Sequence, residues 1–388
     1  MRVAYVSADP GVPVFGSKGC SVHVQEVIRA LGRAGVEVEL HTVRTGGTAP
    51  ADLESVEVFE IPFDRKGGRE AIEERGLAAN ADFTASLSGR PAYDMVYERY
   101  SLWGQAGMEF ARGAGLPGIL EVNAPLVEEQ ATHRTLVHRD EAEAIATRVF
   151  SLASGVVAVS SDAREYVCAN GGAPERVHVI PNGVDPGRFV PAEAGAPERP
   201  FSVGFVGSLK PWHDLDTLVA GYVLLLESQP EARLLIVGDG PERERIEANL
   251  DAAGAGAGVT FSGAIAPAEV PQWIQAMDVG AAPYARDAAR YFSPLKVLEY
   301  MASGIPVVGS RTGQIPELVE EGVAGLLHEA EDAAGLAQAL DTLARDPEAR
   351  GRMGQAARSS VIAHHSWDSV VATTLGLARD AGGHGGSA

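Results

Sequence analysis

The stretch that decides the fold reads Ser-Pro-Leu-Lys-Val-Leu-Glu-Tyr-Met-Ala-Ser-Gly-Ile-Pro-Val-Val and runs from Ser293 to Val308. Ser293 is a favourable helix N-cap, and Pro294 is a favourable first helical residue. Apolar residues then recur at helical spacing, which predicts one buried stripe, formed by Leu295, Leu298 and Ala302. Gly304 is expected to end the helix, and 305–308 to begin a short buried strand.

The start of this helix suits an anion. Its first amides, at Leu295 and Lys296, have no backbone partner and carry partial positive charge, so they favour a phosphate. Glu299 lies about one and a half turns further on. A carboxylate there can accept two hydrogen bonds from a ribose diol, so the sequence predicts a nucleotide site.

The same stretch resembles the signature of family 4 glycosyltransferases, a large retaining group with the GT-B fold, in a subgroup whose donor-site helix begins Ser-Pro-Leu-Lys. The family has two glutamates here, followed by Met-Ala, Gly and Pro-Val-Val. Glu299 matches the second glutamate, which holds the ribose. Tyr291 stands at the first, which touches the donor sugar. The resemblance covers nearly the whole chain and implies transfer of a sugar from a nucleotide-diphosphate sugar to a hydroxyl.

Composition limits the class of protein. The chain has 388 residues, 45% hydrophobic and 22% charged, which suits two globular domains. Its net charge of −20 argues against nucleic acid and anionic membranes as partners. A basic cluster at Arg134, His138, Arg139 and Arg148 is more simply explained as a solvated helix face than as a docking patch.

Cysteine content and hydropathy indicate a reducing compartment. Cys20 and Cys168 are the only cysteines, so neither a disulfide framework nor a metal spacing follows. No apolar run is long enough to span a membrane. The N-terminal residues lead straight into a predicted strand, so we expect no signal peptide and a cytoplasmic location.

Short β-branched runs alternate with amphipathic segments, which predicts parallel sheets covered by helices. We expect two doubly wound, Rossmann-like domains facing a cleft, with ligands at the carboxyl ends of the strands. The expected segments are an acceptor domain at 1–190, a nucleotide-sugar domain at 200–365, a helix crossing back at 366–381, and a flexible tail at 382–388.

Two glycine loops are candidates for contact with the diphosphate. Lys18 and Gly19 precede the first helix, where the family has Gly-Gly beneath a diphosphate. In the second domain Gly207 is followed by Ser208, and His213 comes soon after. The family usually has a basic residue at both of these positions.

Because Ser208 and His213 stand where the family has a basic pair, other groups must neutralise the negative charge of the leaving diphosphate. Lys210 and Lys296 are the expected cations, and His213 is expected to donate a hydrogen bond to phosphate. The alternative is that Lys210 is a surface charge and His213 only a helix-start residue.

The remaining candidates come from single loops. Gly238 can line the nucleotide pocket or serve only the turn. The backbone at Ile265 is expected to contact the base. Glu121 and Asn123 end a first-domain strand, where the family has a loop near the donor sugar, and either can instead be a buried loop residue. His133 is the further acceptor candidate, although a place on a helix face explains it better.

We therefore predict a retaining, metal-independent hexosyltransferase with no cofactor besides its sugar-nucleotide co-substrate and with a soluble hydroxyl acceptor. Two alternatives stay open: a sugar-nucleotide epimerase, and a sugar-nucleotide-binding protein that has lost catalysis. A dinucleotide dehydrogenase is disfavoured because no Gly-x-Gly-x-x-Gly follows either first strand.

Overall fold

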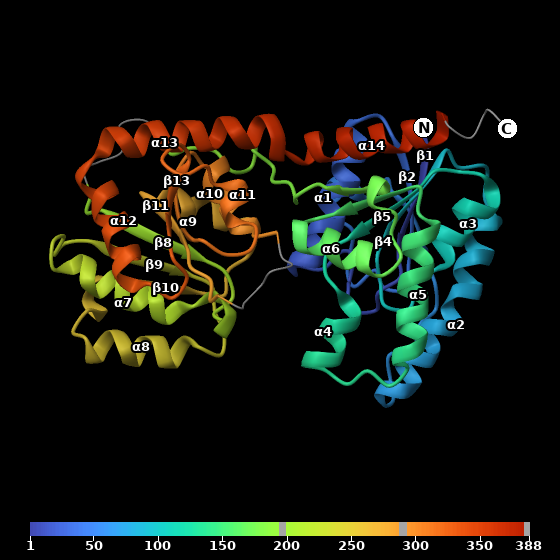
Figure 1. Ribbon diagram of the computed structural model, residues 1–388, viewed down its shortest axis with the longest axis horizontal. Coiled ribbons are helices and arrows are strands. Elements are labelled where there is room, and N and C mark those ends of the chain that lie inside the picture. The colour runs from blue at the N-terminus through green and yellow to red at the C-terminus, as the bar shows by residue number, and fades with distance from the viewer. Residues whose placement is uncertain (194–198, 287–292, 384–388) are drawn as a thin grey trace. The chain divides into compact units, whose positions relative to one another are not determined.

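The computed structural model describes residues 1–193, 199–286 and 293–383 (Figure 1). Tyr291 therefore lies outside the described residues. The chain forms two compact units, one made of Met1–Asn182 with Trp367–Ala388 and the other of Gly183–Ser366. Each unit is an α/β structure built on one parallel sheet.

The first unit contains a seven-stranded sheet in the order β3-β2-β1-β4-β5-β6-β7. Every neighbouring pair is parallel. The order reverses between β1 and β4, which is where ligands bind in open sheets of this kind. The strands are β1 (Arg2–Ser7), β2 (Glu37–Thr42), β3 (Glu57–Glu60), β4 (Met95–Arg99), β5 (Gly118–Val122), β6 (Gly155–Ala158) and β7 (Val177–Val179).

Helices cover both faces of this sheet because alternate strand residues are apolar on each side. Val3, Tyr5 and Met95 pack on one side with α1 and α14, which Figure 1 shows side by side. Ala4 and Val6 pack on the other side with α2, α3, α5 and α6. The helices are α1 (Gly19–Arg33), α2 (Arg69–Ser88), α3 (Ala106–Ala114), α4 (Leu126–His133), α5 (Arg139–Leu152), α6 (Ser161–Ala169) and α14 (Trp367–Gly383).

A buried acid joins β4 to α3. Glu98 is 1% exposed, and its Oε2 accepts a hydrogen bond from the amide of Met108 at 2.9 Å. Gly107 lets the helix approach, since a Cβ there would lie 2.5 Å from the same carboxylate. Burial raises the pKa of Glu98 to about 8, so the group is mainly protonated at neutral pH.

The second unit contains a six-stranded parallel sheet in the order β10-β9-β8-β11-β12-β13. Its strands are β8 (Ser202–Val206), β9 (Arg233–Val237), β10 (Val259–Gly263), β11 (Val279–Ala282), β12 (Val307–Ser310) and β13 (Gly325–His328). Its helices are α7 (Leu215–Leu226), α8 (Arg243–Ala252), α9 (Val270–Gln275), α10 (Leu295–Ala302), α11 (Ile315–Leu318), α12 (Ala333–Arg345) and α13 (Pro347–Ser360).

The unit boundary differs from the expected end of the first domain at 190. The amide of Val184 donates to the carbonyl of His365, and Phe189 is 1% exposed in the core of the second unit. Arg358 donates to the Phe189 carbonyl at 2.8 Å. These contacts place 183–190 with the second unit, whereas α14 belongs to the first.

Helix α10, in the stretch 293–308, starts later than predicted. α10 begins at Leu295, and Pro294 precedes it in an extended conformation with ψ of 90°. The buried face also differs from the expected stripe, because Lys296 is buried while Leu295 is only half-buried. Ser293 is buried just before the helix.

Candidate functional site

Lys296 is a buried cation at the carboxyl end of the second sheet. Its side chain is 7% exposed, and its Nζ lies 4.1 Å from the centre of the Phe205 ring and 5.1 Å from that of Tyr284. Within the described residues Nζ has no hydrogen-bond partner. Burial lowers the pKa of Lys296 to about 7. A buried ammonium group without a hydrogen-bond partner is stabilised by an anion that supplies the missing partner.

Gly207 brings the end of β8 against this amine. A Cβ at Gly207 would lie 3.1 Å from the Lys296 Nζ, and the backbone there has φ of +147°, which favours glycine. Gly238, after β9, has φ of +136°, and a Cβ there would lie 2.0 Å from the Gly207 carbonyl oxygen. The two glycines therefore let the loops after β8 and β9 approach each other and Lys296 closely.

His213 lies beside the same group in a neutral form. It is 8% exposed, and its Nδ1 lies 2.7 Å from the Ser208 carbonyl oxygen, which can only accept, so Nδ1 carries the proton. Burial, with the nearby Lys296 charge, lowers the pKa of His213 to about 3. The other ring nitrogen is then an acceptor, and the expected hydrogen bond from His213 to phosphate does not fit this tautomer.

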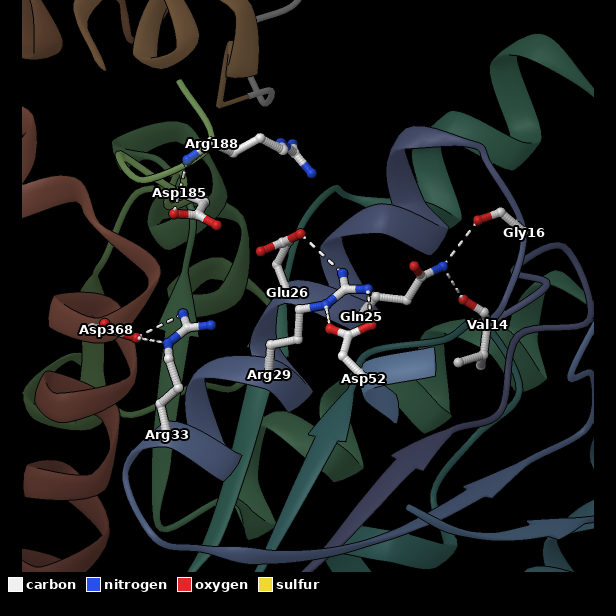
Figure 2. Close-up of polar contacts among 10 residues, drawn as sticks. All are labelled: Val14, Gly16, Gln25, Glu26, Arg29, Arg33, Asp52, Asp185, Arg188 and Asp368. Atoms are coloured by element: carbon white, nitrogen blue, oxygen red, sulfur yellow. Dashed lines mark hydrogen bonds and ion pairs between the residues drawn. The ribbon is translucent and has the colours of Figure 1, made fainter. Parts of the chain in front are cut away.

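Glu299 follows on α10 and is half-buried. Burial raises the pKa of its carboxyl group to about 7, against the opposing effects of the Arg188 and Lys296 charges. Arg188 lies in a turn whose amides at Gly187 and Arg188 donate to the carboxylate of Asp185 (Figure 2). A ligand that donates hydrogen bonds to the Glu299 carboxylate would favour its charged form and lower its pKa.

The other candidates of the second unit occupy nearby loops. Ser208 is exposed, and Lys210 is half-buried with its Nζ 5.9 Å from the centre of the Trp212 ring. Ile265 follows β10 and packs partly against the core. Leu295 supplies the first helical amide of α10.

In the first unit, the loop before α1 is held by one side chain. Gln25 donates to the carbonyl oxygens of Val14 at 2.8 Å and Gly16 at 2.9 Å (Figure 2). Lys18 is the N-cap residue and exposed, and Gly19 is the first helical residue. No side chain caps this helix start, so no capping side chain competes with a ligand for the amides of Gly19 and Cys20.

Two arginines of α1 form ion pairs that fix the helix itself. Arg29 binds Asp52 at 2.5 Å and Glu26 at 3.0 Å, and Arg33 binds Asp368 of α14 at 2.7 Å (Figure 2). They hold α1 within the first unit.

Glu121 lies in a buried polar network. It is 2% exposed, and its Oε1 lies 2.6 Å from His23 Nε2, while Arg99 lies 3.4 Å from its Oε2. Burial raises the pKa of Glu121, but His23 and Arg99 outweigh this effect and bring it to about 2. Its neighbour Asn123 is half-buried, and the Asn123 Nδ2 has no partner among the described residues.

A cavity of about 630 Å³ opens in the first unit beside the ends of β1 and β4. It is lined by residues of 8–11, 65–73, 101–103 and 126–135. Glu121 is not among its lining residues, and the side chain of His133, at the end of α4, lies outside the described part. Sequence reasoning missed Arg65 and Arg69 here, and treated Arg134 as a solvated residue.

A metal site is one further possibility for the described residues. Only Glu70, Glu74 and His138 bring three potential ligand atoms within 4.8 Å of one another there, and both glutamates are exposed. In the described part of the chain, no helix is both long and apolar enough to cross a membrane.

Comparison with known proteins identifies both units. Residues 17–188 match the family model described as Glycosyltransferase Family 4, and residues 200–346 match that of Glycosyl transferases group 1. The D-inositol 3-phosphate glycosyltransferase of Stackebrandtia nassauensis is 29% identical over 98% of this chain and 91% of its own. That of Salinispora arenicola is 28% identical over 92% of this chain and 86% of its own.

Solved structures share the architecture. Sucrose-phosphate synthase from Thermosynechococcus elongatus gives a TM-score of 0.75 at 23% identity over 98% of both chains. Anabaena Alr3699/HepE in complex with UDP and glucose gives 0.70 at 19% identity, over 98% of this chain and all of that one. The chain is a glycosyltransferase of GT-B fold, since each of its units matches a glycosyltransferase family model.

Proposed function

We propose that the protein is a retaining hexosyltransferase that takes its sugar from a nucleotide-diphosphate sugar held by the second unit. The observation that carries this proposal is the pair on α10: Lys296, a buried amine with no hydrogen-bond partner among the described residues, and Glu299, a half-buried carboxylate. A diphosphate satisfies the amine, and a ribose diol satisfies the carboxylate.

The proposed chemistry is the one that the resemblance to retaining family 4 glycosyltransferases implies. The bond between the sugar C1 and the diphosphate oxygen breaks, and a bond between C1 and the acceptor oxygen forms on the same face. The departing phosphate oxygen takes the acceptor proton. Lys296, the amides at the start of α10, and Lys210 stabilise the negative charge that develops on the diphosphate.

The acceptor is proposed to be a small polar molecule bound by the first unit. The two relatives named above are D-inositol 3-phosphate glycosyltransferases, so D-inositol 3-phosphate is the first acceptor to test. At this level of identity the acceptor of a relative does not transfer by itself, so the test must include other hydroxyl compounds.

The experiment is a turnover screen. UDP-, GDP-, ADP- and TDP-sugars are incubated with the enzyme and an acceptor panel, and the product is analysed by mass and by NMR of the new glycosidic bond. We expect one donor class to be consumed with retention of configuration at C1. Inversion would contradict the mechanism, and binding of a donor without any transfer would favour the binding-protein alternative.

A further inference from the structure

Trp212 exposes a large apolar ring in the second unit. Among the Trp, Tyr and Phe side chains of the described residues, that of Trp212 is the only exposed one, at 43%. It belongs to the short turn Pro211–His213 between β8 and α7. Small-molecule sites are lined largely by apolar and aromatic side chains. An exposed ring in the loop that follows Gly207 is therefore a candidate ligand contact.

The loop that carries Trp212 is held by backbone hydrogen bonds on both sides. The amide of Leu209 donates to the carbonyl oxygen of Asp239 at 3.0 Å. The amide of His213 donates to the carbonyl oxygen of Lys210 at 3.1 Å. The position of the ring is thus largely set before a ligand arrives, which lowers the entropy lost on binding.

His213 connects Trp212 to the buried amine of Lys296. The ring centres of Trp212 and His213 are 6.0 Å apart. The His213 ring packs edge-on against Phe205 and Tyr284, with centres 5.4 and 5.3 Å apart. The Lys296 Nζ lies against the same two rings. Trp212 is therefore separated from the proposed diphosphate site by a single side chain.

The order of these groups matches the order of groups in a nucleotide-diphosphate sugar. Glu299 follows Lys296 one turn later on α10, where the charge of Arg188 also acts on it. The contacts thus lead from Glu299 through Lys296 to the turn of Trp212. The ligand has ribose, diphosphate and sugar in that sequence. With the ribose at Glu299 and the diphosphate at Lys296, the sugar is the part that reaches Trp212.

The indole ring suits a pyranose. The face of an aromatic ring is electron-rich, and one face of a pyranose presents C–H groups, so stacking the two buries apolar surface with favourable electrostatics. The Lys210 Nζ lies 5.9 Å from the centre of the same ring. A lysine that is proposed to contact the diphosphate therefore lies against the indole that would contact the sugar.

We propose that Trp212 binds the sugar of the nucleotide-diphosphate sugar by stacking, and so distinguishes the complete donor from the bare nucleoside diphosphate. The inference rests on the proposed function, and it adds a contact to the sugar that Lys296 and Glu299 do not supply.

The first experiment is calorimetry with matched pairs of ligands: UDP with UDP-glucose, GDP with GDP-mannose, ADP with ADP-glucose, and TDP with TDP-glucose. In the pair that binds, we expect Trp212→Ala to weaken the nucleotide sugar at least about fivefold and the nucleoside diphosphate less than about twofold. Trp212→Phe keeps an aromatic ring and should retain most of the affinity for the nucleotide sugar. Since Trp212 is exposed, both variants should fold, which the urea midpoint checks.

The second experiment is quenching of tryptophan fluorescence by acrylamide. The other tryptophans, Trp103, Trp273 and Trp367, are buried or half-buried, so quenching reports mainly on Trp212. We expect the nucleotide sugar to protect the wild type more than its nucleoside diphosphate does, and this difference to disappear in Trp212→Phe. Trp273→Phe is the matched control, because it removes a tryptophan of α9 in the same unit and should keep the protection.

Two results would overturn the inference while leaving the proposed function in place. One is a folded Trp212→Ala variant that binds the nucleotide sugar as tightly as the wild type. The other is equal protection by nucleoside diphosphate and nucleotide sugar, which would assign the ring to the nucleotide. If neither member of any pair bound the wild type, the proposed function itself would fail, and the inference with it.

Discussion

The substitution Lys296→Met tests whether the buried amine is the anion-binding group. The pKa of Lys296 is lowered from 10.5 to about 7 by burial. That difference corresponds to roughly 5 kcal/mol less favourable protonation, as an upper limit. Methionine has a similar length and suits the contacts with Phe205 and Tyr284, so we expect the variant to fold and to lose no stability.

The sign of the pH effect follows from the lowered pKa. At pH 8.5 an amine with a pKa near 7 is about 3% protonated. A bound diphosphate favours the ammonium form and raises the pKa, so binding takes up close to one proton. The affinity of the wild type for the nucleoside diphosphate should therefore be highest below about pH 7 and fall up to tenfold per pH unit above it.

Neighbouring groups contribute little to the proton uptake at pH 8.5. The diphosphate is already fully ionised. Glu299, with a pKa of about 7, is mainly ionised, and His213, with a pKa of about 3, is neutral. The proton count at this pH therefore reports on Lys296.

The assay is titration calorimetry at pH 8.5 in two buffers that differ in ionisation enthalpy, which gives the number of protons taken up. We expect close to one proton for the wild type, close to none for Lys296→Met, and a ten- to thousandfold lower kcat for that variant. Lys210→Met is the matched control, because its amine is half-buried in the same unit, and it should keep the proton uptake. Equal proton uptake in wild type and Lys296→Met would refute the reasoning.

Three further substitutions have defined outcomes. Lys210→Ala should lower kcat about tenfold or more in steady-state kinetics if this lysine stabilises the leaving diphosphate, and an unchanged kcat would remove it from the site. Glu98→Gln should abolish a pH dependence: the raised pKa of about 8 means that the wild type loses stability as the pH rises from 4.5 through 8. Urea unfolding at pH 8.5 should therefore show the variant more stable by up to about 5 kcal/mol, with little difference at pH 4.5. Gly238→Ala would place a Cβ 2.0 Å from the Gly207 carbonyl oxygen at φ of +136°, so it should lower the free energy of unfolding by about 2 kcal/mol or more, whereas Gly113→Ala, with no atom within 4 Å, should not.

The sheets could be predicted from the sequence because their central parallel strands are short apolar runs that are buried on both faces. Val279–Ala282 and Ser202–Val206 are fully buried strands of this kind. Helix ends were less certain, since they depend on backbone angles. Pro294 is a good first helical residue by type, yet its ψ of 90° leaves the helix to begin at Leu295.

The site could be predicted only in part. The motif indicated Glu299 and Lys296, but helical periodicity assigned the buried stripe to apolar residues and did not reveal that Lys296 lies between aromatic rings. The sequence left Glu121 open between a cleft residue and a buried loop residue, because its neutralising partners, His23 and Arg99, come from other elements. The arginine-lined cavity gave no sequence signal, since loops distant in the chain contribute its residues.

Our central proposal is that α10 binds a nucleoside diphosphate through its N-terminal turn and Glu299. The most direct measurement is calorimetric titration of UDP, GDP, ADP and TDP into the wild type and into Glu299→Ala. We predict that one of these nucleotides binds with one site per chain, and that Glu299→Ala weakens it by about ten- to a hundredfold, as expected for the loss of a charge-assisted hydrogen bond. If no nucleoside diphosphate bound, or if a folded Glu299→Ala variant bound it as tightly as the wild type, the claim would be contradicted.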